Sequence, residues 1–100
     1  MTRVNIAGLD RAEIIAALYN ASQPLRMSFL HYDPTDMTRA EAQSYLDRMG
    51  DRPYFDYLKG RVMKVGFDAG SDEMRVDLYD RDNGAGAAAR VIDGLRRKAA

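Results

Sequence analysis

The residue type best suited to acid–base catalysis occurs once in this chain, as His31. Asp33 follows two positions later, and a carboxylate so placed is able to orient a histidine that acts as a general base. However, Asp33 precedes Pro34, and turn chemistry interrupts the strand that would put both side chains on one face. No serine is tied to His31 by a recognisable motif, so a structural histidine is the favoured interpretation. An enzymatic alternative would also draw on Asp80 and Asp82, but we predict no catalytic residue.

Metal-ligating and thiol side chains are equally sparse. With one histidine and no cysteine, the chain is expected to hold no transition metal and no thiol nucleophile. Residues 80–84 faintly resemble a calcium loop, but an EF-hand loop needs glycine at its sixth position and glutamate at its twelfth. Counted from Asp80, Gly84 is the fifth residue and Val91 the twelfth. We therefore expect no metal ion and no other cofactor.

A glycine-rich stretch over residues 84–89 matches the letters of the dinucleotide-binding fingerprint. That site also needs a further strand with an acidic residue about 20 positions downstream. Only 14 residues follow Gly86, so a dinucleotide site is not expected. A simpler possibility stays open, namely an anion bound by backbone N–H groups at a helix start.

Length and composition limit the fold and the partners. A chain of 100 residues fits one domain, spanning 1–100. Its 15 basic and 15 acidic side chains cancel, which argues against nonspecific nucleic-acid binding. Leu, Ile, Val and Phe together number only 20, so a core this small favours self-association into a homo-oligomer. No apolar run approaches the roughly 18 residues of a membrane span, and no signal peptide is recognisable, so we expect a cytoplasmic protein.

Capping signals predict where helices begin. Two pairs follow the pattern of a capping residue with a glutamate three positions later, which satisfies backbone N–H groups at a helix start. The pair Asp10 with Glu13 predicts a helix over residues 11–21, and the pair Thr38 with Glu41 predicts a helix that ends at Gly50. A third helix is expected after the turn residues 82–84. The two pairs are Asp10 with Glu13 and Thr38 with Glu41.

Alternation of apolar and polar residues predicts the sheet. Residues 62–67 and 74–79 alternate on either side of the loop 68–73, which is typical of a hairpin. Residues 26–32 predict another strand, and residues 54–58 either add one more or form a single helical turn. The sequence therefore predicts a single small α+β domain, in which an antiparallel sheet of three to four strands packs against three helices. The predicted order is α-β-α-β-β-β-α.

The balanced charge is unevenly distributed. Residues 52–64 carry a net charge of +3, residues 68–82 carry −4, and residues 90–100 carry +3. Pairing between strands, such as Lys64 with Asp77, explains these blocks without a partner. A surface of two signs that is complementary to a protein partner is the alternative. On that alternative, the predicted contact residues are Arg61, Lys64, Arg75, Tyr79 and Arg81.

Three parts of the chain carry a resemblance to a known group of proteins. They are the sequences ALYNAS with MSFLHY, then FDYLKGRVMKV, then LYDRDNG with GAA, and the similarity extends over about residues 9–95. The chain resembles a group of small proteins encoded in phages, prophages and neighbouring bacterial DNA. Proteins from such neighbourhoods include anti-defence factors, among them anti-CRISPR inhibitors.

The resemblance implies a non-enzymatic inhibitor in the host bacterial cytoplasm. Its partner would be a host defence protein or a CRISPR effector complex, bound by protein–protein contact without direct contact to nucleic acid or membrane. The alternative is a binding module for a nucleotide or another anion, acting as a sponge for a defence signal. The polar and aromatic residues that favour this alternative are Tyr19, Asn20, Arg61, Lys64, Arg81 and Asn83.

Overall fold

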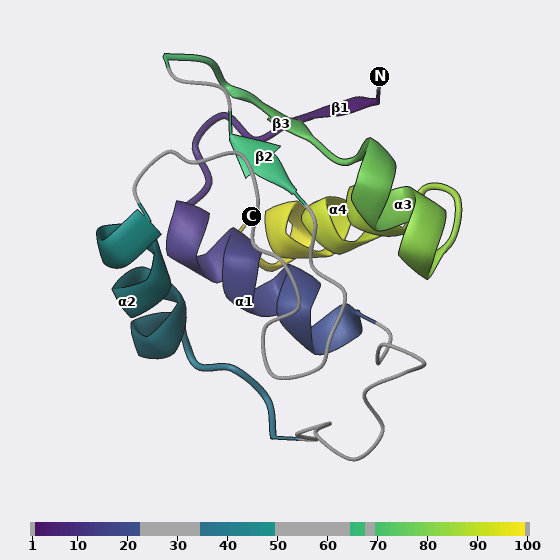
Figure 1. Cartoon of the computed structure of the whole chain (residues 1–100). Helices are drawn as coiled ribbons and strands as arrows, with labels where there is room; N and C mark the ends of the chain where they lie inside the picture. Colours follow the sequence, from purple (N-terminus) through teal and green to yellow (C-terminus); the bar gives the residue numbers. More distant parts are fainter. Residues whose placement is uncertain (1, 23–34, 50–64, 68–69, 100) are drawn as a thin grey trace.

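The computed structural model describes residues 2–22, 35–49, 65–67 and 70–99 (Figure 1). Within them, a three-stranded antiparallel sheet in the order β1-β3-β2 lies on one side of the helices. The α+β class is therefore confirmed, with four helices in the described residues where three were predicted. The elements are β1 (Arg3–Asn5), α1 (Arg11–Ala21), α2 (Arg39–Met49), β2 (Gly66–Phe67), β3 (Glu73–Arg75), α3 (Asp77–Asn83) and α4 (Ala87–Ala99).

Helix α1 occupies the predicted range and forms the centre of the core. Its start is fixed by Asp10, whose carboxylate accepts a hydrogen bond from the Ala12 N–H at 3.3 Å. Its end is fixed by Ser22, whose backbone N–H and hydroxyl both donate to the Tyr19 carbonyl, at 3.1 and 2.7 Å. These hydrogen bonds satisfy some of the backbone N–H and C=O groups that have no partner within the helix at its two ends. The buried residues of α1 are Ala12, Ile14, Ile15, Ala16, Leu18 and Tyr19.

Helix α2 also begins where the capping pair predicts. The Glu41 N–H donates to the Thr38 hydroxyl at 3.2 Å, and the Thr38 N–H donates to the Glu41 carboxylate at 3.4 Å. The approach to α2 is held against α1 by the Asn20 amide. Its oxygen accepts from the Met37 N–H at 2.7 Å, while its nitrogen donates to the Met37 carbonyl at 3.2 Å.

The predicted hairpin is confirmed in part and wrong in part. Strands β2 and β3 are antiparallel, with Phe67 opposite Met74. The second strand, predicted over 74–79, ends at Arg75, and the chain continues as α3. Burial explains the change: Met74 and Val76 lie two positions apart, as on a strand, whereas Tyr79 follows three positions later, as on a helix.

Strand β1 was not predicted. It pairs with β3, with Val4 opposite Met74, although the two strands lie near opposite ends of the chain. Its outer side is covered from α4, because Arg96 donates to the Asn5 and Ala7 carbonyls at 2.9 and 3.0 Å. A charged side chain that is hydrogen-bonded to the backbone of an edge strand hinders the pairing of that strand with another chain. The strands predicted over 26–32 and 54–58 lie outside the described residues.

The C-terminal helix α4 confirms the third predicted helix. It begins directly after Gly86, whose φ of 74° lies in the left-handed region that glycine adopts without strain. Helix α1 packs against α2 on one side and α4 on another, and α3 packs against α4. Among the described helices, none combines the length and the apolar character that a membrane crossing requires.

Candidate partner-binding site

The short helix α3 is joined to the end of α1 by Tyr79. Its hydroxyl donates to the Leu18 carbonyl at 2.7 Å, and this bond is buried. Leu18 lies in the last turn of α1, where the Ser22 N–H bonds to the Tyr19 carbonyl. The Tyr79 hydroxyl therefore satisfies a carbonyl at the helix end. Burial, together with the nearby Asp80 charge, raises the pKa of Tyr79 far above its usual range.

The next residue, Asp80, joins α3 to the start of α4. Its carboxylate accepts a hydrogen bond from the Ala88 N–H at 3.0 Å, which caps the first turn of α4. In the same turn, the Arg90 guanidinium donates to the Ala85 carbonyl at 3.0 Å. At this helix start, where the sequence allows an anion site, the Ala88 N–H thus already binds a carboxylate of the same chain.

These two bonds shape a cavity, which we call the α3 hollow. It measures about 280 Å³ and lies where the end of α1, helix α3 and the first half of α4 meet. Its lining is mainly apolar, with one guanidinium and one side-chain amide. The described lining residues are Ala21, Tyr79, Asn83, Ala87, Arg90 and Val91.

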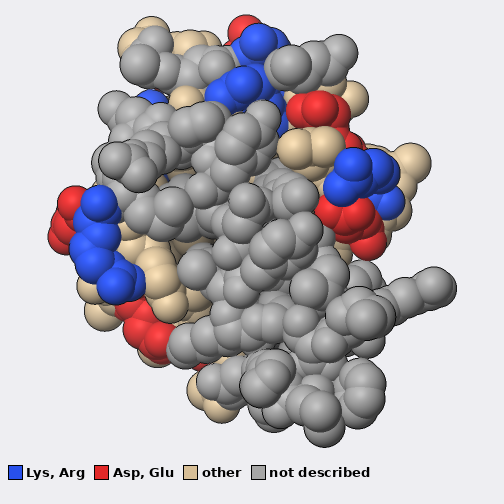
Figure 2. Space-filling model, in the orientation of Figure 1, with Lys and Arg blue, Asp and Glu red and all other residues tan. Residues whose placement is uncertain are grey.

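Charged residues of both signs lie on the two helices, α3 and α4, that contribute to the α3 hollow. Arg81 is exposed and forms an ion pair with Asp82 at 3.2 Å. Arg90 is exposed at the hollow itself. In the view of Figure 2, cationic and anionic side chains lie next to one another at several places among the described residues. The described part of this surface therefore carries charges of both signs, and residues 52–64, one of the three charge blocks of the sequence, lie outside the described residues.

The residues predicted to contact a partner do not share one hairpin face. Tyr79 lies on α3 and is fully buried, so its prediction as an exposed contact was wrong. Arg75 is half-buried on β3, and Arg81 is exposed on α3. The prediction failed because it continued the strand through residues that form a helix. Arg61 and Lys64 lie outside the described residues.

The residues of the ligand-binding alternative are also divided. Tyr19 is fully buried in the core, so its ring is not available to stack on a base. Asn83 lines the α3 hollow and donates from its amide nitrogen to the Tyr79 carbonyl at 3.0 Å. Asn20 lines a different hollow. No single site in the described residues therefore contains this set.

Sequence reasoning missed Arg90 and Val91 as lining residues of the α3 hollow. Together with Ala87, they lie three and four positions apart and so share one face of α4. This spacing was visible in the sequence, but the element opposite that face was not. It becomes informative only once residues 77–83 are known to form a helix.

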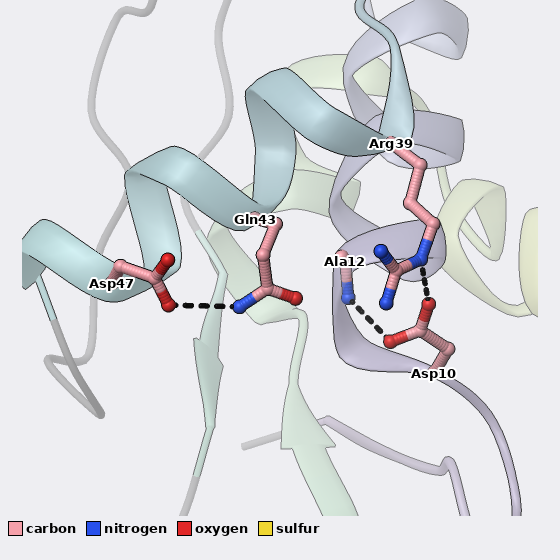
Figure 3. Close-up of polar contacts among 5 residues, drawn as sticks. All are labelled: Asp10, Ala12, Arg39, Gln43 and Asp47. Carbon is pink, nitrogen blue, oxygen red and sulfur yellow. Dashed lines mark hydrogen bonds and ion pairs between the residues drawn. The ribbon is translucent and has the colours of Figure 1, made fainter.

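A larger hollow, which we call the α1 groove, measures about 490 Å³. Its described lining residues are Glu13, Ala16, Ala17, Asn20, Arg39, Leu95 and Lys98. The Arg39 side chain reaches from the start of α2 to Asp10, and its Nε donates to the Asp10 carboxylate (Figure 3). This bond holds the pKa of Asp10 below its ordinary value.

Within the described ranges, no group of three or more histidine, aspartate or glutamate side chains is placed to hold a metal ion. His31 and Asp33 lie outside those ranges. Comparison of the chain with protein-family models, with curated proteins and with solved structures gave no match.

Proposed function

We propose that this chain is a non-enzymatic, phage-type anti-defence protein, which inhibits a host immune complex by protein–protein contact in the bacterial cytoplasm. The observation that carries the proposal is the α3 hollow, with its apolar walls and the exposed Arg90 at its side. Protein interfaces obtain much of their affinity from a few side chains that enter such pockets, inside a polar rim. The resemblance to phage and prophage proteins supplies the class of partner.

The size of the α3 hollow favours a protein side chain as its occupant. Pockets for small molecules usually enclose about 300–1,000 Å³. At about 280 Å³, the α3 hollow lies just below that range and suits one or two side chains of a partner. Arg90 would pair with a carboxylate beside that anchor, since arginine binds carboxylates with two parallel hydrogen bonds.

The charges around the α3 hollow favour a specific partner over a nonspecific one. Arg81 and Asp82 are of opposite sign and adjacent, so a surface of a single charge would be attracted by one and repelled by the other. A protein partner with its own pattern of charges fits such a rim better than a uniformly anionic polymer does. Binding through this rim should weaken as the salt concentration rises.

The proposal is tested in bacteria that carry a defence system and are challenged with phage. Expression of the chain should restore plaque formation, and the purified chain should bind the defence complex. Arg90→Glu, in the α3 hollow, should abolish both effects. Arg97→Glu is the matched control, because Arg97 is exposed on the same helix and does not line the hollow. The proposal is wrong if no defence complex is bound and infection is not restored, or if both variants behave alike.

The ligand-binding alternative is separated from this proposal by a thermal-shift screen against nucleotides. A ligand at 100 times its dissociation constant stabilises the folded state by about 2.7 kcal/mol. We expect no nucleotide to stabilise the chain. A clear rise in the melting temperature with one nucleotide would favour the signal sponge instead.

A further inference from the structure

The α1 groove presents small side chains at its floor and long ones at its sides. Ala16, Ala17 and Asn20 lie three, four and seven positions after Glu13, so all four residues share one face of α1. Ala16 and Ala17 have only a methyl group each. Because these two side chains are small, the side chains of another helix are able to approach the backbone of α1 closely at this point.

Helix α4 supplies the complementary shape to the same groove. Leu95 packs partly against the core and is half-buried, Lys98 is exposed, and the two lie three positions apart on one face of α4. The groove surface therefore includes both a hollow of alanines and two long side chains of a size that fills such a hollow.

The groove is also complementary to itself in charge. Glu13 is exposed on α1 and Lys98 is exposed on α4, and neither forms an ion pair with another residue in the part of the chain that the structure describes. Arg39 is half-exposed and is held in place by Asp10. Thus the groove carries a carboxylate on α1, which lies within the electrostatic reach of Arg39, and an ammonium group on α4.

We infer that the α1 groove binds a second copy of this chain. In the resulting dimer, Leu95 and Lys98 of each subunit enter the alanine hollow of the other. Lys98 then approaches Glu13 of the partner subunit, and the two-fold axis repeats the contact. Apolar burial stabilises the dimer, and the two ion pairs set its orientation.

This inference goes beyond the proposed function and uses a separate surface. The described lining residues of the α1 groove and of the α3 hollow do not overlap. Each subunit of the dimer would therefore keep its α3 hollow for the defence complex. The limited supply of large apolar residues in the sequence gives a second reason for an extra interface.

The test is sedimentation velocity on the full chain, from low micromolar to millimolar concentration. The wild type should change from monomer to dimer as its concentration rises. Glu13→Lys and Lys98→Glu each place two like charges together, and each should weaken dimerisation at least about tenfold. The double variant reverses both charges and so restores the ion pair with its signs exchanged. Its dimer dissociation constant should return to within about threefold of the wild-type value.

Two controls keep the test decisive. Arg97→Glu changes the charge of the neighbouring residue on α4 without touching the α1 groove, and it should dimerise like the wild type. Circular dichroism on each variant separates lost association from lost folding. The inference is overturned if the wild type stays monomeric at millimolar concentration, or if the double variant remains as weak as the single ones. Neither outcome would change the result of Arg90→Glu in the phage assay.

Discussion

Replacing Tyr79 by phenylalanine removes a single hydroxyl group from the core and keeps the ring. The hydroxyl donates to the Leu18 carbonyl at 2.7 Å, and this bond is buried. The Ser22 N–H bonds to the Tyr19 carbonyl at 3.1 Å, so it is not available as a replacement donor. A buried acceptor that loses its donor costs about 1–3 kcal/mol. Because the site lies at a helix end, we expect Tyr79→Phe to lower the free energy of unfolding by about 1–2 kcal/mol.

The loss of stability in Tyr79→Phe should also depend on pH. Folding raises the pKa of Tyr79, mainly through burial, whereas a tyrosine in the unfolded chain ionises near pH 10. Below about pH 10 the stabilisation is fully present, and as pH rises further the unfolded state loses the proton first. The wild type should therefore lose stability above about pH 10. The Phe variant lacks this contribution, so the difference in stability between the two proteins should shrink in alkali.

Urea denaturation at a series of pH values measures both effects. In a thermal melt at neutral pH, the same loss of unfolding free energy corresponds, for a domain of this size, to a fall in melting temperature of about 5–15 °C. Tyr45→Phe is the matched control, because Tyr45 is only half-buried on α2, and it should change stability by less than about 0.5 kcal/mol. If Tyr79→Phe unfolds at the same urea concentration as the wild type, with the same dependence on urea, the buried bond does not stabilise the fold and the reasoning fails.

Three further substitutions test other contacts of the fold. Asp80→Ala removes the cap of α4 and should cost about 1 kcal/mol in urea denaturation, whereas Asp80→Asn keeps an acceptor and should cost less; equal losses would contradict the cap. Asp10→Asn removes the ion pair with Arg39. Because folding lowers the pKa of Asp10, the free energy of unfolding of the wild type should fall by under about 1 kcal/mol as pH drops below about 4. Urea denaturation should show a smaller fall for the variant, and an equal fall would mean that the ion pair does not stabilise the fold. Arg96→Ala frees the carbonyls next to β1 and should speed amide exchange there, while Arg97→Ala should not; unchanged exchange would mean that Arg96 does not hold the strand.

The helices that the sequence predicts well are those whose ends are determined by neighbouring residues. Asp10 caps α1 and Thr38 caps α2 through bonds that span two or three positions, and both are visible in the sequence. Strand β1 differs, since it exists only because it pairs with β3 near the other end of the chain. A run of three residues, Arg3–Asn5, carries too little alternation to indicate a strand by itself.

The candidate site was less predictable than the fold for a related reason. Its predicted residues were placed on a strand that continued to residue 79, and the chain turns into a helix at Asp77. Arg81 and Asn83 stayed near the surface in either case. The change moved Tyr79 into the core, where its hydroxyl meets α1, and it brought Arg90 of α4 to the hollow. Periodicity over six residues is too short to separate a strand from a helical turn.

Two consecutive residues of α3 determine the shape of the α3 hollow. Tyr79 holds the end of α1, and Asp80 holds the first turn of α4. The hollow lies between the elements that these two bonds fix, so its geometry depends on α3 even where its walls belong to α1 and α4. A change at either residue would alter stability and partner binding together. Substitutions that probe partner binding therefore belong on α4, at Arg90, which is exposed at the hollow and takes part in neither of these two bonds. Circular dichroism on Arg90→Glu separates lost binding from the loss of its own bond to the Ala85 carbonyl.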